Sequence, residues 1–473
     1  MKHTDIIQKL NLEQKCALLS GETVFTTRAL PGKDIPAITL SDGPNGVRKQ
    51  AGAADHLGLN PSVPATCFPT SSATACSWDE KLGEAVGEAL GEEAAAQEVA
   101  VLLGPGLNIQ RSPLCGRDFE YFSEDPILAG RMAAAYVRGI QKNGISACPK
   151  HFAVNSQELR RMASDSVLDE RTLRELYLTG FEIVVKEAKP KTIMTSYNLI
   201  NGTYANENAH LLQDILRKDW GFDGAVVTDW GGSNDHALGV KNGSTLEMPC
   251  PGGDSIRELM KAVQDGKISE ADVDARLDEM LELVLSTHAA VEKAPRTFDA
   301  AAHHKLARRA AAESIVLLRN EGGILPLKPN EKLAVIGDFA ETPRYQGAGS
   351  SAVNALQVDT LLDCIKADDS GITFVGYASG FERQGAADAE KLEEAVALAK
   401  KADTVLLCLG LDELRESEGL DRSDMKLAEN QQQLLAAVAA VNPNVVVLLS
   451  AGAPVETPWA GQCRALVYGA LGG

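Results

Sequence analysis

The sequence predicts an α/β protein of two domains, an N-terminal (β/α)8-type barrel followed by a doubly wound α/β sandwich domain. Over the first part of the chain, short apolar runs alternate with helical stretches, which is typical of a parallel sheet with helices outside it. A proline-containing stretch then separates this part from a second series of strands and helices. The length of 473 residues also exceeds that of one ordinary domain.

In the first part of the chain, each predicted strand is followed by glycine, proline or polar residues. The predicted strands are 38–40, 99–103, 145–148, 192–195, 225–227 and 245–248, and the helices are 79–98, 171–187, 207–220 and 270–291. A repeat of about six to eight strand–helix units in this length suits a (β/α)8-type barrel. We therefore assign residues 1–291 to the barrel.

The second domain follows a linker, which we assign to residues 292–310, although a helix is expected to resume at 300–319. Residues 311–473 contain predicted strands at 333–336, 373–377, 404–409, 445–449 and 465–468, with helices at 358–367, 386–401 and 429–441. This alternation predicts an open doubly wound sheet. Because the sequence stops directly after the last strand, we expect this domain to be truncated at its C-terminus.

Charge and composition narrow the classes of partner. A net charge of −19 disfavours nucleic acid or an anionic membrane, because phosphates are bound by clusters of Lys and Arg. The sequence contains no apolar run long enough for a transmembrane helix and no apolar N-terminal signal core. The nine cysteines include no Cys-x-x-Cys pair and no zinc-type spacing. We expect a cytoplasmic protein that needs no metal or cofactor and acts on a neutral small molecule.

One carboxylate follows a predicted strand almost directly. Asp229 comes after the strand 225–227 and stands beside Trp230 and two glycines. Catalytic groups of barrel enzymes lie at the C-terminal ends of strands, so Asp229 is a candidate nucleophile or general base. The alternative is that it caps the next helix, a position that Asp prefers. Tyr197 would hydrogen bond to such a nucleophile, or would be a buried tyrosine with a backbone partner.

Basic side chains follow the strand 145–148. Lys150 and His151 end that strand, and Arg161 comes soon after. Such groups suit hydrogen bonds to sugar hydroxyls or the stabilisation of a carboxylate. The alternative is that Lys150 and His151 only pair with neighbouring acids.

Two further loops add polar groups to the same predicted rim. Asp42 and Arg48 follow the strand 38–40, although the Asp-Gly-Pro sequence at that point also predicts a simple turn. Arg117 lies in the segment 116–126, which is dense in aromatic and charged residues and is expected to pack as an active-site loop.

The second domain contributes a charged loop, 412–422, after the strand 404–409. If this loop reaches the mouth of the barrel, it brings a second carboxylate, and two facing carboxylates suggest glycoside hydrolysis. The glycine-rich segment 347–351 offers nucleotide binding as an alternative, but it lacks the full glycine pattern and a Walker lysine.

Taken together and in this order, these motifs resemble glycoside hydrolase family 3, in its β-glucosidase-like branch. The resemblance runs from residue 12 to about residue 469. It is carried by Asp42-Gly-Pro-Asn-Gly-Val-Arg48, by Leu114-Cys-Gly-Arg-Asp-Phe-Glu-Tyr-Phe-Ser-Glu-Asp125, by Lys150-His-Phe with Arg161, and by Val226-Val-Thr-Asp229-Trp.

The resemblance implies roles for individual residues. Asp229 would form a covalent glycosyl-enzyme and Tyr197 would steady it, while Glu418 in the charged loop would be the acid/base, with Glu416 as the runner-up. The expected sugar contacts are Asp42, Arg48, Arg117, Lys150, His151, Arg161, Tyr197, Trp230 and Ser350.

The implied activity is that of a retaining, exo-acting glycoside hydrolase that releases terminal β-linked glucose from oligosaccharides or glucosides. The alternatives are a β-xylosidase or another exo-β-glycosidase, or a truncated sugar-binding protein without turnover. The sequence leaves the oligomeric state open, a homodimer being one option.

Overall fold

The first domain is built on short, fully buried parallel strands. In the computed structural model, which describes residues 1–52 and 60–473, these strands are β1 (Leu40–Asp42), β2 (Val101–Leu103), β3 (Ser146–Ala147), β5 (Thr192–Met194) and β8 (Ala225–Val227). They form the parallel sheets β1-β2-β3 and β5-β8, and a bridge between Phe152 and Thr195 joins the two. The segment predicted as a strand at 245–248 contributes only isolated bridges, one of them between Leu246 and Val227. The eight-unit barrel therefore stays a prediction.

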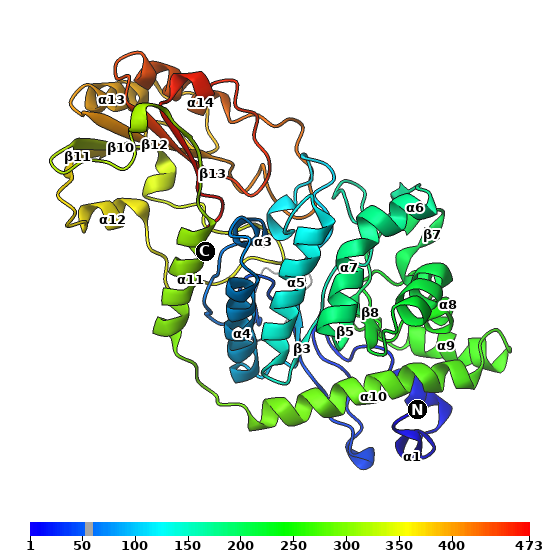
Figure 1. The fold of residues 1–473 in the computed structure, drawn as a ribbon. Helices are drawn as coiled ribbons and strands as arrows, with labels where there is room; N and C mark the ends of the chain where they lie inside the picture. The colour runs from blue at the N-terminus through cyan, green and yellow to red at the C-terminus, as the bar shows by residue number, and fades with distance from the viewer. Residues whose placement is uncertain (53–59) are drawn as a thin grey trace.

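Helices surround these strands (Figure 1). The main ones are α4 (Glu80–Ala96), α5 (Pro126–Gln141), α7 (Thr179–Ile183), the π-helix η6 (His210–Asp219), α8 (His236–Asn242), α9 (Asp254–Gln264) and α10 (Glu270–Lys293). Shorter elements are α1 (Thr4–Ile7), α2 (Leu12–Ala17), η1 (Pro31–Lys33), α3 (Ser71–Ala75), η2 (Asp118–Glu120), α6 (Glu170–Thr172), η3 (Leu173–Leu178), η4 (Val184–Ala188) and η5 (Ala205–Glu207), with the small sheet β4 (Asp165–Ser166), β6 (Leu199–Ile200) and β7 (Thr203–Tyr204). Asp79 and Asp125 begin α4 and α5 by accepting hydrogen bonds from the first free backbone N–H groups.

The second domain contains one six-stranded sheet, seen at the upper left of Figure 1. Its strands are β9 (Val316–Asn320), β10 (Lys332–Ile336), β11 (Thr373–Ala378), β12 (Thr404–Gly410), β13 (Val445–Ser450) and β14 (Ala465–Tyr468), in the order β11-β10-β12-β13-β14-β9. The five consecutive strands β10 to β14 are parallel and follow the 2-1-3-4-5 order of doubly wound sheets. The helical elements are η7 (Glu321–Gly323), η8 (Asp338–Ala340), α12 (Leu361–Lys366), α13 (Ala389–Ala399), α14 (Glu429–Ala439) and η9 (Ala460–Gln462). The truncation stays a prediction.

The helix predicted at 300–319 is wrong in its second part. The helix α11 (Ala300–Ser314) ends earlier, and β9 follows it as an antiparallel edge strand paired with β14. The run Ile315-Val316-Leu317-Leu318 is apolar and partly β-branched, which favours a strand over a helix once a neighbouring edge is available. Ala307 and Ala310 of α11 belong to the core of the first domain, so much of the predicted linker packs as part of that domain.

The side chain of Phe119 packs between the two domains. Each domain has its own hydrophobic core, but Phe119 of the first domain is fully buried against the second. A Cβ atom at Gly347 would lie 2.0 Å from the Phe119 ring, and one at Gly452 would lie 2.2 Å from its Cβ. Only glycine fits on either side of this ring, so the ring fixes how the second domain approaches the first.

This topology brings site loops from both domains together. In the first domain, β1 ends at Asp42 itself. The other three strands end two or three residues before a site residue: β3 before Lys150, β5 before Tyr197 and β8 before Asp229. In the second domain, the loops after β10 and β12 leave neighbouring strands at the point where the strand order reverses, where ligands bind in sheets of this kind. These loops carry Ser350 and Glu418.

Candidate active site

Asp229 lies buried at the end of β8 and does not cap a helix. The next helix, α8, begins at His236, and its N-cap is Asp235, whose side chain accepts a hydrogen bond from Leu238 N–H. The Asp229 carboxylate instead accepts a 2.8 Å hydrogen bond from the backbone N–H of Trp230. The helix-cap alternative is therefore wrong, and the carboxylate is free to act in the site.

The charges of two arginine side chains act on this carboxylate. Burial raises the pKa of Asp229, while the charges of Arg161 and Arg117 act in the opposite direction. The two guanidinium charges favour the ionised carboxylate, which is the state that a nucleophile requires.

His151 lies next to Asp229 but is not its ion-pair partner at neutral pH. The His151 Nε2 atom is 3.7 Å from Asp229 Oδ2, and its Nδ1 atom is 3.1 Å from the Tyr121 hydroxyl. Burial holds the pKa of His151 well below its usual value, and the charges of Arg117 and Lys150 act in the same direction. The imidazole is therefore neutral and can exchange hydrogen bonds with a neutral ligand.

Glu120 organises two of the cations. Its carboxylate accepts a 2.7 Å hydrogen bond from Arg117 Nε and lies 3.0 Å from Lys150 Nζ. Burial acts to raise the pKa of Glu120, but Arg117 and Lys150 outweigh it and lower that pKa. Lys150 thus does pair with a neighbouring acid, as one alternative from the sequence had it. Glu120 could not be predicted as part of the site, because its contact with Lys150 is set by the fold.

Asp42 and Arg48 lie on the same rim. Arg48 Nη1 is 4.0 Å from Asp42 Oδ2 and donates a 3.5 Å hydrogen bond to the Ser350 carbonyl oxygen of the second domain. Burial raises the pKa of Asp42 to about 6, against the charges of Lys150 and Arg48. Asp42 is therefore a partly buried carboxylate beside Arg48, as well as part of a turn.

Glu418 reaches this cluster from the second domain. Its Oε1 atom accepts a 2.9 Å hydrogen bond from Arg161 Nη1 and lies 3.6 Å from Arg117 Nη1. Its Oε2 atom accepts a 2.7 Å hydrogen bond from the backbone N–H of Ser350. Burial acts to raise the pKa of Glu418, but Arg117 and Arg161 outweigh it and hold the pKa below its usual value.

Glu416, two residues earlier, faces away from the cluster. It is fully buried inside the second domain, where Oε1 accepts a 2.7 Å hydrogen bond from Gly452 N–H and Oε2 is 3.9 Å from Arg344. Burial raises its pKa to about 7. Glu418 is instead paired with the site arginines Arg117 and Arg161. Geometry thus favours Glu418 as the second carboxylate of the site.

Tyr197 and Trp230 form one wall beside Asp229. The Tyr197 hydroxyl donates a 2.9 Å hydrogen bond to the Trp230 carbonyl oxygen, which is the backbone partner that the sequence left as an alternative. Burial, followed by the negative charge of Asp229, raises the pKa of Tyr197. Arg161 lies over the Tyr197 ring at 4.8 Å, and the Trp230 ring leans on Phe25 at 5.2 Å. The wall thus places aromatic faces next to the cations.

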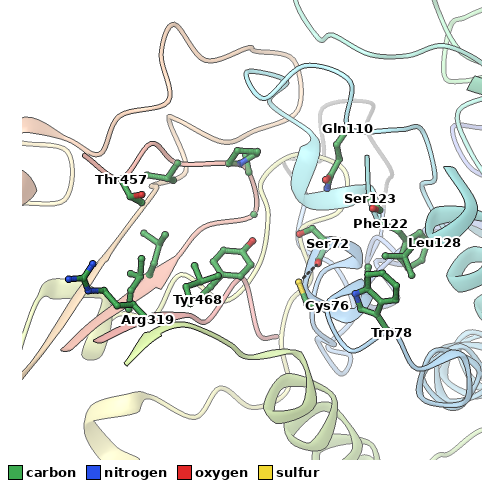
Figure 2. Close-up of a pocket in the computed structure, with 18 of the residues that line it drawn as sticks. Ser72, Cys76, Trp78, Gln110, Phe122, Ser123, Leu128, Arg319, Thr457 and Tyr468 are labelled. Carbon is green, nitrogen blue, oxygen red and sulfur yellow. Dashed lines mark hydrogen bonds between the residues drawn. The ribbon is translucent and has the colours of Figure 1, made fainter. Parts of the chain in front are cut away.

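A cavity of about 720 Å³ opens elsewhere between the domains (Figure 2). Trp78, Gln110 and Phe122 line it from the first domain, and Arg319 and Tyr468 line it from the second. None of the expected catalytic or sugar-binding residues is among its lining residues. We therefore assign the chemistry to the charged cluster around Asp229 and not to this cavity.

Two further features of residues 1–52 and 60–473 concern metal binding and the membrane. In that part of the chain, no group of three or more His, Cys, Asp or Glu side chains is arranged to hold a metal ion. In the same residues, no helix is both long and apolar enough to cross a membrane.

Two family models match the chain, one before α11 and one after it. Residues 52–283 match the glycosyl hydrolase family 3 N terminal domain, and residues 315–473 match the glycosyl hydrolase family 3 C-terminal domain. The chain belongs to glycosyl hydrolase family 3. Its relatives place this family 3 chain in the β-glucosidase-like branch.

Known relatives of this family 3 chain are glycosidases. It is 45% identical over 471 residues to the thermostable beta-glucosidase B of Acetivibrio thermocellus, a match that covers 99% of this chain and 62% of the relative. It is 44% identical over 473 residues to the exo-alpha-(1->6)-L-arabinopyranosidase of Bifidobacterium longum, covering 98% and 62%. Beta-glucosidase 3B of Thermotoga neapolitana, solved in complex with alpha-D-glucose, superposes with a TM-score of 0.90 at 32% identity, covering 100% of this chain and 72% of that one. The chain thus spans 62% of the length of these two curated relatives.

Proposed function

We propose that the protein is a retaining, exo-acting glycoside hydrolase that releases terminal β-linked glucose through a covalent intermediate on Asp229. One observation carries the proposal: Glu418 of the second domain pairs with Arg117 and Arg161 of the first, and the charges of the same two arginines act to lower the pKa of Asp229. Two carboxylates in one cationic site are the minimum equipment for retaining hydrolysis, in which they stand about 5–5.5 Å apart. The (β/α)8-type barrel predicted from the sequence remains part of this proposal.

In the first step, an Asp229 carboxylate oxygen attacks the anomeric carbon while the bond from that carbon to the leaving oxygen breaks. Glu418 gives its proton to the leaving oxygen. In the second step, Glu418 takes a proton from water, the water oxygen attacks the anomeric carbon, and Asp229 leaves as a carboxylate. Two inversions at the same carbon retain the β-configuration of the sugar.

Glu418 must be protonated in the first step, whereas its ion pairs with Arg117 and Arg161 keep it ionised in the unliganded site. We propose that the sugar resolves this conflict. Its hydroxyl groups accept hydrogen bonds from the guanidinium N–H groups of Arg117 and Arg161, which then stabilise the Glu418 anion less. The pKa of Glu418 therefore rises while Asp229 is still charged. Once Asp229 is esterified its charge is gone, so the pKa of Glu418 falls and the same group serves as the base.

Sugar recognition is assigned to the polar groups around these carboxylates. Lys150 and neutral His151 offer donors to distal hydroxyls, and Asp42 is placed beside Lys150 to accept from them. The glucose complex of the Thermotoga relative supports a hexose. The Bifidobacterium relative favours a second candidate, an α-L-arabinopyranoside, because this pentose presents an equatorial leaving group in the same sense as a β-glucoside.

The nine cysteines are free thiols, which supports a reducing, cytoplasmic location.

The substrate is tested with a panel of aryl glycosides: β-glucoside, β-xyloside and α-L-arabinopyranoside. We expect the β-glucoside to have the highest kcat/KM. A higher kcat/KM for one of the pentosides would replace glucose in the proposal, and sugar binding without cleavage of any glycoside would refute hydrolysis.

A further inference from the structure

One carboxylate outside the assigned site gathers backbone groups from the other domain. Asp421 lies in the segment 411–422 after β12, here called the acid loop because it carries Glu418. Its Oδ1 atom accepts hydrogen bonds from the backbone N–H of Gly116 at 3.1 Å and of Glu158 at 2.9 Å. Its Oδ2 atom accepts from Glu158 N–H at 3.1 Å and from Leu159 N–H at 2.9 Å.

These N–H groups belong to the two loops that carry the site arginines. Gly116 immediately precedes Arg117, and Glu158 and Leu159 lie shortly before Arg161. A single side chain of the second domain therefore joins the loops of Arg117, Arg161 and Glu418.

The same three loops touch closely around this side chain. A Cβ atom at Gly116 would lie 1.7 Å from the Leu420 carbonyl oxygen, so the two backbones are in direct contact. A neighbouring carboxylate, that of Glu158, accepts a 2.9 Å hydrogen bond from Gly419 N–H and a 2.7 Å hydrogen bond from Arg161 Nη1. The acid loop is thus registered against the first domain on both sides of Glu418.

We propose that Asp421 is a positioning residue that fixes Glu418 over the site by clamping the acid loop to the two arginine loops. This inference rests on the proposed hydrolase function. Hydrogen bonds from N–H groups to an ionised acceptor are stronger than neutral ones, and several of them converge on one side chain here. Without them, the acid loop loses its registration, while Arg117 keeps its own contacts with Glu120.

The test uses Asp421→Ala, Asp421→Asn and a matched control, Asp424→Asn. Asp424 lies in the same part of the second domain, but the contacts of its side chain are with Lys426 N–H and Arg415, both of that domain. Asp421→Asn keeps one acceptor oxygen and turns an NH₂ group toward backbone N–H groups, so it should fold and yet weaken the clamp.

Two readouts are measured on each folded variant. The first is kcat/KM for an alkyl glucoside, whose leaving group needs a proton, and for 2,4-dinitrophenyl glucoside, whose leaving group departs without one. We expect Asp421→Ala to lower kcat/KM for the alkyl glucoside by about 100-fold, the scale of a small misplacement of a catalytic group, and to lower it by less than about 10-fold for the dinitrophenyl glucoside. Asp421→Asn should fall between, and Asp424→Asn should match the wild type.

The second readout is amide hydrogen exchange of the unliganded protein, which does not depend on activity. We expect faster exchange in peptides covering 114–122 and 155–162 in both Asp421 variants and no change in Asp424→Asn. Unchanged exchange, or equal losses on both substrates, would overturn the clamp. If the wild type cleaves no glycoside but exchange rises as expected, the clamp stands and the proposed function fails.

Discussion

The two nearby glutamates of the acid loop give opposite expectations, and Glu418→Gln and Glu416→Gln compare them directly. In the wild type, Ser350 N–H donates a 2.7 Å hydrogen bond to Glu418. A glutamine at 418 keeps an oxygen that can accept this hydrogen bond, but it cannot donate a proton to the leaving group. A glutamine at 416 keeps the oxygen that accepts from Gly452 N–H. The two variants therefore differ mainly in whether a carboxyl group is lost from the cluster around Asp229.

The expected loss follows from the role of the group. General acid catalysis contributes about 10²–10⁴-fold, so Glu418→Gln should lower kcat/KM for an alkyl glucoside by about 10³-fold, or roughly 4 kcal/mol in the barrier. For 2,4-dinitrophenyl glucoside the loss in kcat/KM should stay below about 10-fold, because this leaving group needs no proton. Glu416→Gln should change either value by less than about 10-fold, because its carboxyl group lies outside the cluster.

The assay is a steady-state comparison across aryl and alkyl glucosides of increasing leaving-group pKa. A plot of log kcat/KM against that pKa should be steep for Glu418→Gln and shallow for both the wild type and Glu416→Gln. The reasoning is refuted if the steep dependence belongs to Glu416→Gln, or if Glu418→Gln loses the same factor on every substrate.

Further expectations concern pH, charge and packing. Because burial raises the folded-state pKa of Glu416 to about 7, above the 4.5 of an unperturbed glutamate, its contribution to stability is present below pH 4.5 and is lost as pH rises through 7. In the wild type this loss amounts to at most about 3 kcal/mol in the free energy of unfolding between pH 5 and pH 8. Glu416→Gln should show a smaller decrease over the same range, as measured by urea titration at the two pH values. Arg161→Met removes a cation that lowers the pKa of Asp229, so the acidic limb of the kcat/KM profile for the dinitrophenyl glucoside should move up by about one pH unit; a downward move would contradict this. Phe119→Ala should cost about 3–5 kcal/mol in urea unfolding because its ring is fully buried between the domains, and a cost below about 1 kcal/mol would refute the interlocking role.

Local sequence patterns predicted most strands and helices and the position of Asp229, because these depend mainly on nearby residues. Asp229 could be placed at a strand end because the short buried run before it is apolar throughout. The two-domain α/β organisation followed from the alternation of such runs with amphipathic helices. The edge strand β9 was missed because its apolar run directly continues an alanine-rich helix, and only its pairing with β14 decides that it is a strand.

The parts of the site that depend on contacts between distant loops could not be predicted. Glu120, Glu158 and Asp421 look like ordinary charged loop residues, and their partners lie in other loops. Glu416 and Glu418 differ in sequence only by two positions, yet the turn between them sends one into the core of the second domain and the other into the site. The partner of the Tyr197 hydroxyl was likewise set by where the backbone of Trp230 runs.

The central claim is that Asp229 forms a covalent bond to the sugar. The most direct measurement incubates the protein with 2,4-dinitrophenyl 2-deoxy-2-fluoro-β-glucoside, digests it and maps the labelled peptide by mass spectrometry. We predict one added fluoro-glucosyl group on the peptide that contains Asp229, and no label in Asp229→Ala. A label on another residue, or rapid turnover of good substrates with inversion of the anomeric configuration, would contradict the account.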